Sequence, residues 1–250
     1  MVFSLRLNFA LSLVAMLVIT TASAAELTVV ATTGPLPAVV GAIIPIFDKA
    51  TGHKVTIKYI FEPELANHLK EIGDADVVIA EPAVIDAIAK GGAFGGERIP
   101  IMISKIGIAT RAGAPKPDIG TPEKLKAALI AAKSIAYNAG PSGRHFVTVA
   151  DGLGLADVLK SKAVIVRGEP VGAVVARGAA ELGVQQVAEL LPIPDTEFVG
   201  PLPGNLQMQI PFSAGIQART KNLEAAKAFA VFFTSPAVVT VMKSKGVDPI

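Results

Sequence analysis

The residues best suited to chemistry form a short glycine-rich segment, Gly140-Pro-Ser-Gly-Arg-His145. Gly140 and Gly143 allow the backbone to approach a ligand closely, and Ser142 can cap a following helix. Arg144 carries a planar cation that can grip a carboxylate with two hydrogen bonds. The segment therefore predicts an anion clamp. The alternative is an ordinary capped helix start with a solvated Arg144.

A second polar group follows the apolar run Leu27–Ala31. The hydroxyls of Thr32 and Thr33 can donate to a ligand, and Gly34 lets the backbone come close to it. A helix cap followed by a turn explains the same residues equally well. Both interpretations remain open at this point.

Two glutamines and several glutamates also stand at the ends of apolar runs. Gln185 and Gln186 each offer an acceptor and two donors, and because they are adjacent we expect only one to face a ligand. Glu62 and Glu81 could meet a hydroxyl or amine of a ligand, or could favour helix N-termini through the dipole. For Glu64 we favour the dipole interpretation.

The composition excludes several classes of function. The 250 residues contain no cysteine, so disulfides, thiolate metal sites and cysteine nucleophiles are excluded. The three histidines, at 53, 68 and 145, are far apart and lack metal-ligand spacing, and no nucleotide-binding or serine hydrolase motif occurs. A formal net charge of +2 gives no basic patch for nucleic acid. We expect no metal and no cofactor.

The N-terminus has the organisation of a secretion signal. Arg6 precedes the apolar stretch Phe9–Ile19, which is too short to span a bilayer, and Ala22-Ser23-Ala24 fits the small-x-small cleavage rule. Residues 1–24 are therefore predicted to be a signal peptide, cleaved near Ala24 or Ala25. The mature protein is expected to be exported to the periplasm.

The elements that must position these residues alternate between strands and helices. Apolar runs predict strands at 27–31, 54–60, 76–80, 135–137, 163–166 and 182–186, separated by stretches with helical periodicity. Repeated strand–helix units predict an α/β fold with mainly parallel sheets flanked by helices. In such sheets ligands bind beyond the carboxyl ends of the strands, which is where the polar groups above stand.

The pattern divides the mature chain into two lobes. Residues 25–105 together with 206–250 are predicted to form lobe 1, because two C-terminal helices follow the second α/β unit and return to the first. Residues 106–205 are predicted to form lobe 2. Two strands are expected to cross between the lobes.

Several segments resemble a known family. The runs LTVVATTGPLPAVV, TGHKV, LANHLKEIGDADVVIAEP and SPAVVTVMKSKGVDP are similar to periplasmic substrate-binding proteins of ABC transporters, of type II and the molybdate-binding-protein-like branch. The resemblance covers residues 26–249. It implies a two-lobed binding protein, which we expect to be monomeric, that captures a small anion and delivers it to a membrane permease.

The same resemblance bears on the ligand. In the molybdate branch two loop serines bind the oxyanion, and Gly34 and Glu62 or Pro63 stand at the matching positions. A tyrosine of that branch appears here as Gln186. Because a carboxylate repels a tetrahedral dianion, a carboxylate ligand is favoured over molybdate.

A sub-branch of the family implies an alternative function. The runs RAGAPKPDI, GPSGRHFVTVADGLG and VGPLPGNLQ resemble a group that includes a periplasmic aconitate isomerase. Such an enzyme moves a proton on an unsaturated tricarboxylate, which requires a base. His145 is the candidate for that role.

Overall fold

The computed structural model describes residues 24–250 of the chain. The predicted signal peptide therefore lies outside the described residues, except for its last residue, Ala24.

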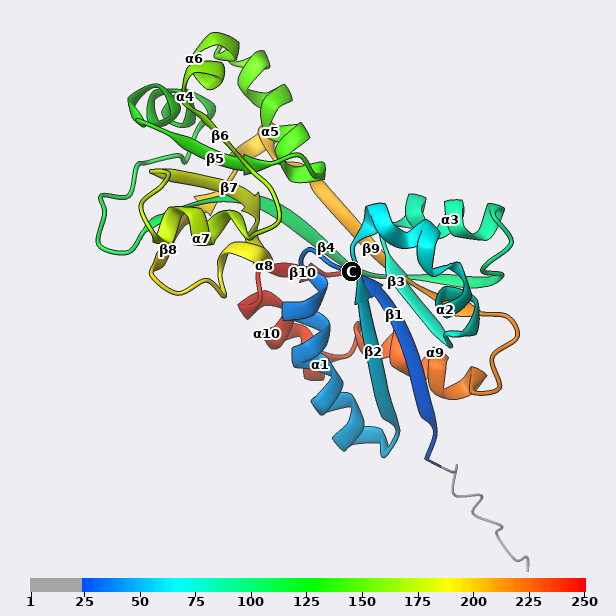
Figure 1. The fold of residues 1–250 in the computed structure, drawn as a ribbon. Coiled ribbons are helices and arrows are strands. Elements are labelled where there is room, and N and C mark those ends of the chain that lie inside the picture. Colours follow the sequence, from blue (N-terminus) through cyan, green and yellow to red (C-terminus); the bar gives the residue numbers. More distant parts are fainter. Residues whose placement is uncertain (1–23) are drawn as a thin grey trace, which may run out of the picture.

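Strands of both lobes join into one continuous, curled sheet (Figure 1). Its strands are β1 Glu26–Thr32, β2 Lys54–Ile60, β3 Val77–Ala80, β4 Gly96–Arg111, β5 Ile135–Asn138, β6 Ala163–Val166, β7 Leu182–Gln186, β8 Thr196–Pro201, β9 Gln209–Gln217 and β10 Val247–Pro249. The order is β2-β1-β3-β9-β4-β7-β5-β6, and β8 and β10 also pair with β4.

The outer strands of each lobe are parallel. In lobe 1, β1 lies between β2 and β3, and in lobe 2, β5 lies between β6 and β7. The strands next to β4 are antiparallel to it, as are β9 and β3. Parallel pairing brings the carboxyl ends of β1, β2 and β3 to one edge, which is the edge predicted to bind ligand.

Strand β4 belongs to both lobes. Its residues Gly96 to Lys105 pair with β9, and its residues Ile106 to Thr110 pair with β7. Figure 1 shows β4 and β9 running between the two lobes, so that both act as crossing strands. The predicted α/β fold with two lobes and two crossing strands is confirmed. The boundaries predicted at residues 105 and 205 stay a prediction.

Helices flank the sheet in each lobe. They are α1 Leu36–Thr51, α2 Leu69–Asp74, α3 Pro82–Lys90, α4 Pro122–Ala131, α5 Pro141–Gly152, α6 Ala156–Lys162, α7 Val171–Ala176, α8 Val187–Leu190, α9 Leu223–Phe232 and α10 Pro236–Ser244, with 3-10 turns η1 Glu62–His68 and η2 Gly204–Leu206. Sequence periodicity did not indicate α6 or the short strand β10, because both elements are brief.

The two C-terminal helices complete lobe 1. Phe229 and Phe233 on or beside α9 are fully buried, and Phe47 of α1 packs edge-on against Phe229 with ring centroids 5.1 Å apart. This packing buries a large aromatic area between two segments that are far apart in the sequence. Burial of these apolar side chains therefore holds the C-terminal helices against the first lobe.

Within residues 24–250 no single helix is long and apolar enough to cross a membrane. Only the bent pair α9 and α10, at 55° to each other, meets the length and composition criterion when taken together.

Candidate functional site

A cavity of about 120 Å³ lies where the strand ends of the two lobes meet. Lobe 1 contributes the loops after β1, β2 and β3, and lobe 2 contributes the ends of β5 and β7 with the starts of α5 and α8. The lining residues are Thr32, Thr33, Gly34, Pro35, Phe61, Glu62, Glu81, Asn138, Gly140, Pro141, Ser142, Gln186, Glu189 and Phe212. The position agrees with the strand-end rule for open α/β sheets.

Two helices from different lobes begin at this cavity. Helix α1 starts after Pro35 and α5 starts after Gly140, and neither N-terminus has a side-chain cap. The first backbone N–H groups of a helix have no intrahelical acceptor, and the helix dipole adds positive potential there. Both helix ends therefore offer hydrogen-bond donors to an anion.

The start of α5 is held tightly against the end of β5. A Cβ placed on Gly143 would lie 1.6 Å from the carbonyl oxygen of Asn138, and Gly140 N donates to Asn138 Oδ1 at 3.0 Å. Gly143 is therefore required for the close packing of helix on strand. Ser142 does not cap α5 as predicted, because the N-cap is Gly140, two residues earlier.

A buried set of acceptors forms another part of the wall. Gln185 accepts from Val171 N at 3.1 Å and donates from Nε2 to Glu189 Oε1 at 2.7 Å. Gln186 is only 5% exposed, and its Oε1 has no hydrogen-bond partner among the described residues. Burial raises the pKa of Glu189 to about 7. Hydrogen bonds from the amides of Gln185 and Gln186 lower the same pKa, but their effect is smaller.

Two further carboxyl groups line the lobe 1 side of the cavity. Burial raises the pKa of Glu81, and the nearby charge of Glu62 raises it further. The charge of Arg144 acts in the opposite direction on the same group. With Glu189, the cavity holds three carboxyl groups, so its electrostatics disfavour a compact dianion.

Aromatic and proline side chains supply the apolar part of the lining. Phe61 is 57% exposed at the end of β2, and Phe212 on β9 is buried. Pro35 and Pro141 stand at the two helix starts. An exposed aromatic ring at a polar cavity offers an apolar surface to the carbon skeleton of a ligand.

The structure brings together six of the nine residues predicted to bind ligand. Those lining the cavity are Thr32, Thr33, Gly34, Glu62, Ser142 and Gln186. Gly143 and Gln185 lie directly behind the wall, where they position Ser142 and Glu189.

Arg144 and His145 are not among the residues that line the cavity. Arg144 is exposed, and its Nη1 donates to the carbonyl oxygen of Ala139 at 2.9 Å. His145 is half-buried, with Nε2 2.8 Å from the carbonyl oxygen of Leu206. The bidentate grip of Arg144 and the proton transfer by His145 stay predictions, and neither is supported by these positions.

Glu189 and Asn138 are lining residues that the sequence interpretation did not select. Glu189 lies in the first turn of α8, three residues after the N-cap Gln186, and an acidic residue at a helix start was the signal that could have identified it. Phe61 and Phe212 carried no such signal, because isolated aromatic residues are normally core residues.

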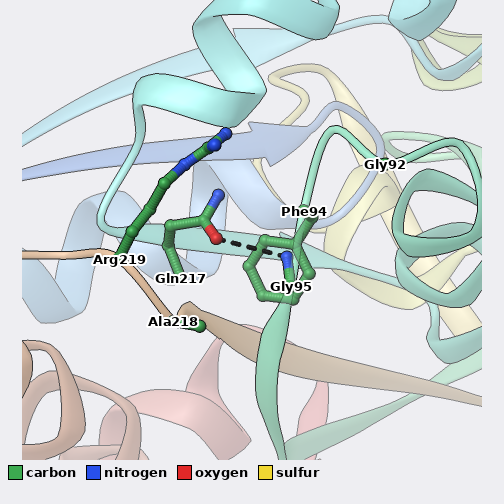
Figure 2. A pocket seen from close by; sticks show the side chains of 6 residues that line it. All are labelled: Gly92, Phe94, Gly95, Gln217, Ala218 and Arg219. Atoms are coloured by element: carbon green, nitrogen blue, oxygen red, sulfur yellow. Dashed lines mark hydrogen bonds between the residues drawn. The ribbon is translucent and has the colours of Figure 1, made fainter.

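A second cavity, of about 320 Å³, lies beside the start of β4 and the end of β9 (Figure 2). Its polar side chain Gln217 accepts from Gly95 N at 3.2 Å and donates to Gly73 O at 3.2 Å. Arg219 donates to the same Gly73 oxygen at 3.4 Å. The side-chain amide of Gln217 is therefore engaged by backbone groups.

Comparison with known proteins agrees with this arrangement. The profile of the family described as bacterial extracellular solute-binding protein matches residues 27–248. An aconitate isomerase from a Pseudomonas species is 31% identical over 228 residues, covering 88% of this chain and 87% of that protein.

Two solved structures share the fold. The periplasmic molybdate-binding protein of Azotobacter vinelandii superposes with a TM-score of 0.67 at 24% identity, covering 89% of this chain and 98% of that one. Peb3 from Campylobacter jejuni gives a TM-score of 0.67 at 17% identity, covering 89% and 99%. The family profile matches nearly the whole described chain, and the sequence relative and the shared fold are consistent with that match. The chain therefore belongs to the bacterial extracellular solute-binding protein family.

Proposed function

We propose that this protein binds a small organic carboxylate in the cavity between its lobes and delivers it to the membrane permease of an ABC importer. The proposal includes export of the chain, removal of residues 1–24 with cleavage near Ala24 or Ala25, and action as a monomer in the periplasm. Family membership supports the role of a solute-binding protein.

One observation carries the proposal: the uncapped N-termini of α1 and α5, from different lobes, line the same cavity. Each offers free backbone N–H groups and the positive end of a helix dipole. An anion held between them would contact both lobes at once. Binding therefore favours the arrangement in which the lobes are close together.

The lining favours a carboxylate over a tetrahedral inorganic dianion. Glu62, Glu81 and Glu189 repel a compact double charge, whereas a carboxylate on a carbon skeleton can keep its charge at the helix ends. Phe61 then covers the apolar part of the ligand. The molybdate-binding protein of Azotobacter vinelandii shares the fold at 24% identity, so its ligand does not indicate the ligand of this chain.

Native mass spectrometry of the protein purified without refolding tests the proposal, together with thermal shifts measured with carboxylates and with molybdate, tungstate and sulfate. We expect a bound organic acid or a clear stabilisation by one or more carboxylates, because a ligand that binds only the folded state raises its stability. Stabilisation by molybdate or tungstate, and by no carboxylate, would refute the ligand class.

A second candidate is an isomerase on the same scaffold. The 31% identity to an aconitate isomerase favours it, and Glu189, whose pKa burial raises to about 7, lines the cavity as the candidate proton acceptor. Incubation with cis- or trans-aconitate in D2O, followed by NMR, tests this function. Interconversion with deuterium incorporation that is lost in Glu189→Gln supports it, and no interconversion at high protein concentration excludes it.

A further inference from the structure

The cavity wall contains a buried acceptor that the protein itself does not satisfy. Gln186 Oε1 has no hydrogen-bond partner among the described residues, although 95% of the residue is removed from solvent. A buried acceptor that is left unpaired has lost its hydrogen bonds to water without replacing them, which is unfavourable. Because Gln186 also lines the cavity, a group bound there can supply the missing donor.

Glu189, three residues further along the chain, is a second hydrogen-bond acceptor in the same wall. It lines the cavity, and its Oε1 is held by Gln185 Nε2 at 2.7 Å, which fixes the orientation of the carboxyl group. Gln185 is itself held by Val171 N at 3.1 Å, so α7, β7 and α8 share one hydrogen-bonded chain. The acceptors are therefore positioned before any ligand arrives.

We propose that Gln186 and Glu189 form an acceptor subsite that takes a hydroxyl group of the ligand, so that the bound molecule is a hydroxycarboxylate. The inference rests on the proposed function, because the carboxylate of that ligand occupies the helix N-termini. Donors at the helix ends and acceptors on Gln186 and Glu189 together match one molecule that carries both groups.

The two subsites are close together. A Cβ on Gly34, in the loop that leads into α1, would lie 3.7 Å from Gln186 Nε2, so the side-chain amide of Gln186 lies next to this loop. A hydroxyl on the carbon next to the carboxylate satisfies this short spacing, as in malate, citrate or lactate. A site built to hydrogen-bond a hydroxyl discriminates strongly against the analogue that lacks it, since the buried acceptor is then left unpaired.

Isothermal titration with matched pairs tests the inference: malate against succinate, citrate against tricarballylate, and lactate against propionate. We expect at least one hydroxylated member to bind at least about tenfold more tightly than its partner. The preference should fall to about threefold or less in Gln186→Met, which keeps the length of the side chain and removes the amide. Gln209→Met, an exposed glutamine on β9 outside the cavity, is the matched control and should keep the preference.

The other outcomes overturn the inference in distinguishable ways. Equal or tighter binding of every unhydroxylated member, or an unchanged preference in Gln186→Met, removes the acceptor subsite and leaves carboxylate binding intact. Binding of inorganic oxyanions alone, or of no anion, overturns the proposed function as well. If Gln186→Met does not fold, Glu189→Gln provides the comparison, with an expected loss of at least about threefold in the preference.

Discussion

Gln185 Nε2 donates to Glu189 Oε1 at 2.7 Å, and this contact holds a carboxyl group at the wall of the interlobe cavity. The same amide accepts from Val171 N at 3.1 Å, so its orientation is fixed from both sides. Burial raises the pKa of Glu189 to about 7. The contact thus fixes the orientation of a carboxyl group whose pKa is raised by burial.

Replacing Glu189 by glutamine should make the ligand-free protein more stable at alkaline pH. The folded-state pKa of about 7 exceeds the ordinary value of 4.5, so the folded state holds the proton more tightly than the unfolded state. This contribution is complete below pH 4.5 and is lost as the pH rises through 7. Glu189→Gln should raise the free energy of unfolding at pH 8 by roughly 2–3 kcal/mol and leave it nearly unchanged at pH 4.5.

Urea unfolding of both proteins between pH 4.5 and 8 measures this difference. Glu64→Gln, at an exposed glutamate outside the cavity lining, is the control and should follow the wild type. A Glu189→Gln variant with the same pH profile as the wild type would show that Glu189 titrates normally.

Removing the charge of Glu81 should tighten anion binding. Glu81 lines the cavity, and burial and the charge of Glu62 raise its pKa. Its ionised form repels an anionic ligand, so Glu81→Gln should lower the dissociation constant roughly three- to tenfold at pH 7.5. Wild-type affinity should rise as the pH falls from 7.5 to 5.5, and the slope should be smaller in the variant. Weaker binding by Glu81→Gln in isothermal titration would mean that Glu81 contacts the ligand directly.

Two glycines of helix α5 should respond to alanine in opposite ways. Gly143→Ala places a Cβ 1.6 Å from the Asn138 carbonyl oxygen, whereas no atom lies within 4 Å of a Cβ on Gly152. We expect Gly143→Ala to lower the free energy of unfolding by about 2–3 kcal/mol or more, because a backbone atom cannot move aside as a side chain does. Gly152→Ala should be neutral or stabilising by up to about 1 kcal/mol. Denaturant unfolding measures both, and equal effects would contradict the packing of α5 on β5.

Arg144 should act on the ligand through distant charge and not through contact. It is exposed, it bonds to the Ala139 carbonyl oxygen, and its charge reaches Glu81. Arg144→Ala should therefore weaken carboxylate binding only roughly two- to fivefold, with a smaller effect at high salt. Titrations at two salt concentrations measure this. A loss of affinity of about a hundredfold would instead indicate that Arg144 binds the carboxylate directly with two hydrogen bonds.

Much of the fold follows from periodicity and strand-end rules. The runs at 163–166 and 182–186 are the observed strands β6 and β7. Thr32, Thr33 and Gly34 reach the cavity because they directly follow a parallel strand. These features depend on local sequence, which is why they could be predicted.

The orientation of individual side chains could not be obtained in the same way. Arg144 and Ser142 are two residues apart, yet only Ser142 lines the cavity, because the N-cap of α5 is Gly140, two residues earlier than predicted. Glu189 lies on a four-residue helix whose position depends on β4 and β7. Phe212 reaches the site from a strand that crosses between the lobes. These placements come from tertiary packing, which the local pattern does not encode.

Amide chemical shifts in two-dimensional NMR test the central claim most directly. Titration with the carboxylate that gives the largest thermal shift should move the backbone amides of Gly34, Ser142 and Gly143, at the starts of α1 and α5. Binding that leaves these amides unchanged and moves those of Gly95 and Gln217, in the second cavity, would contradict the account.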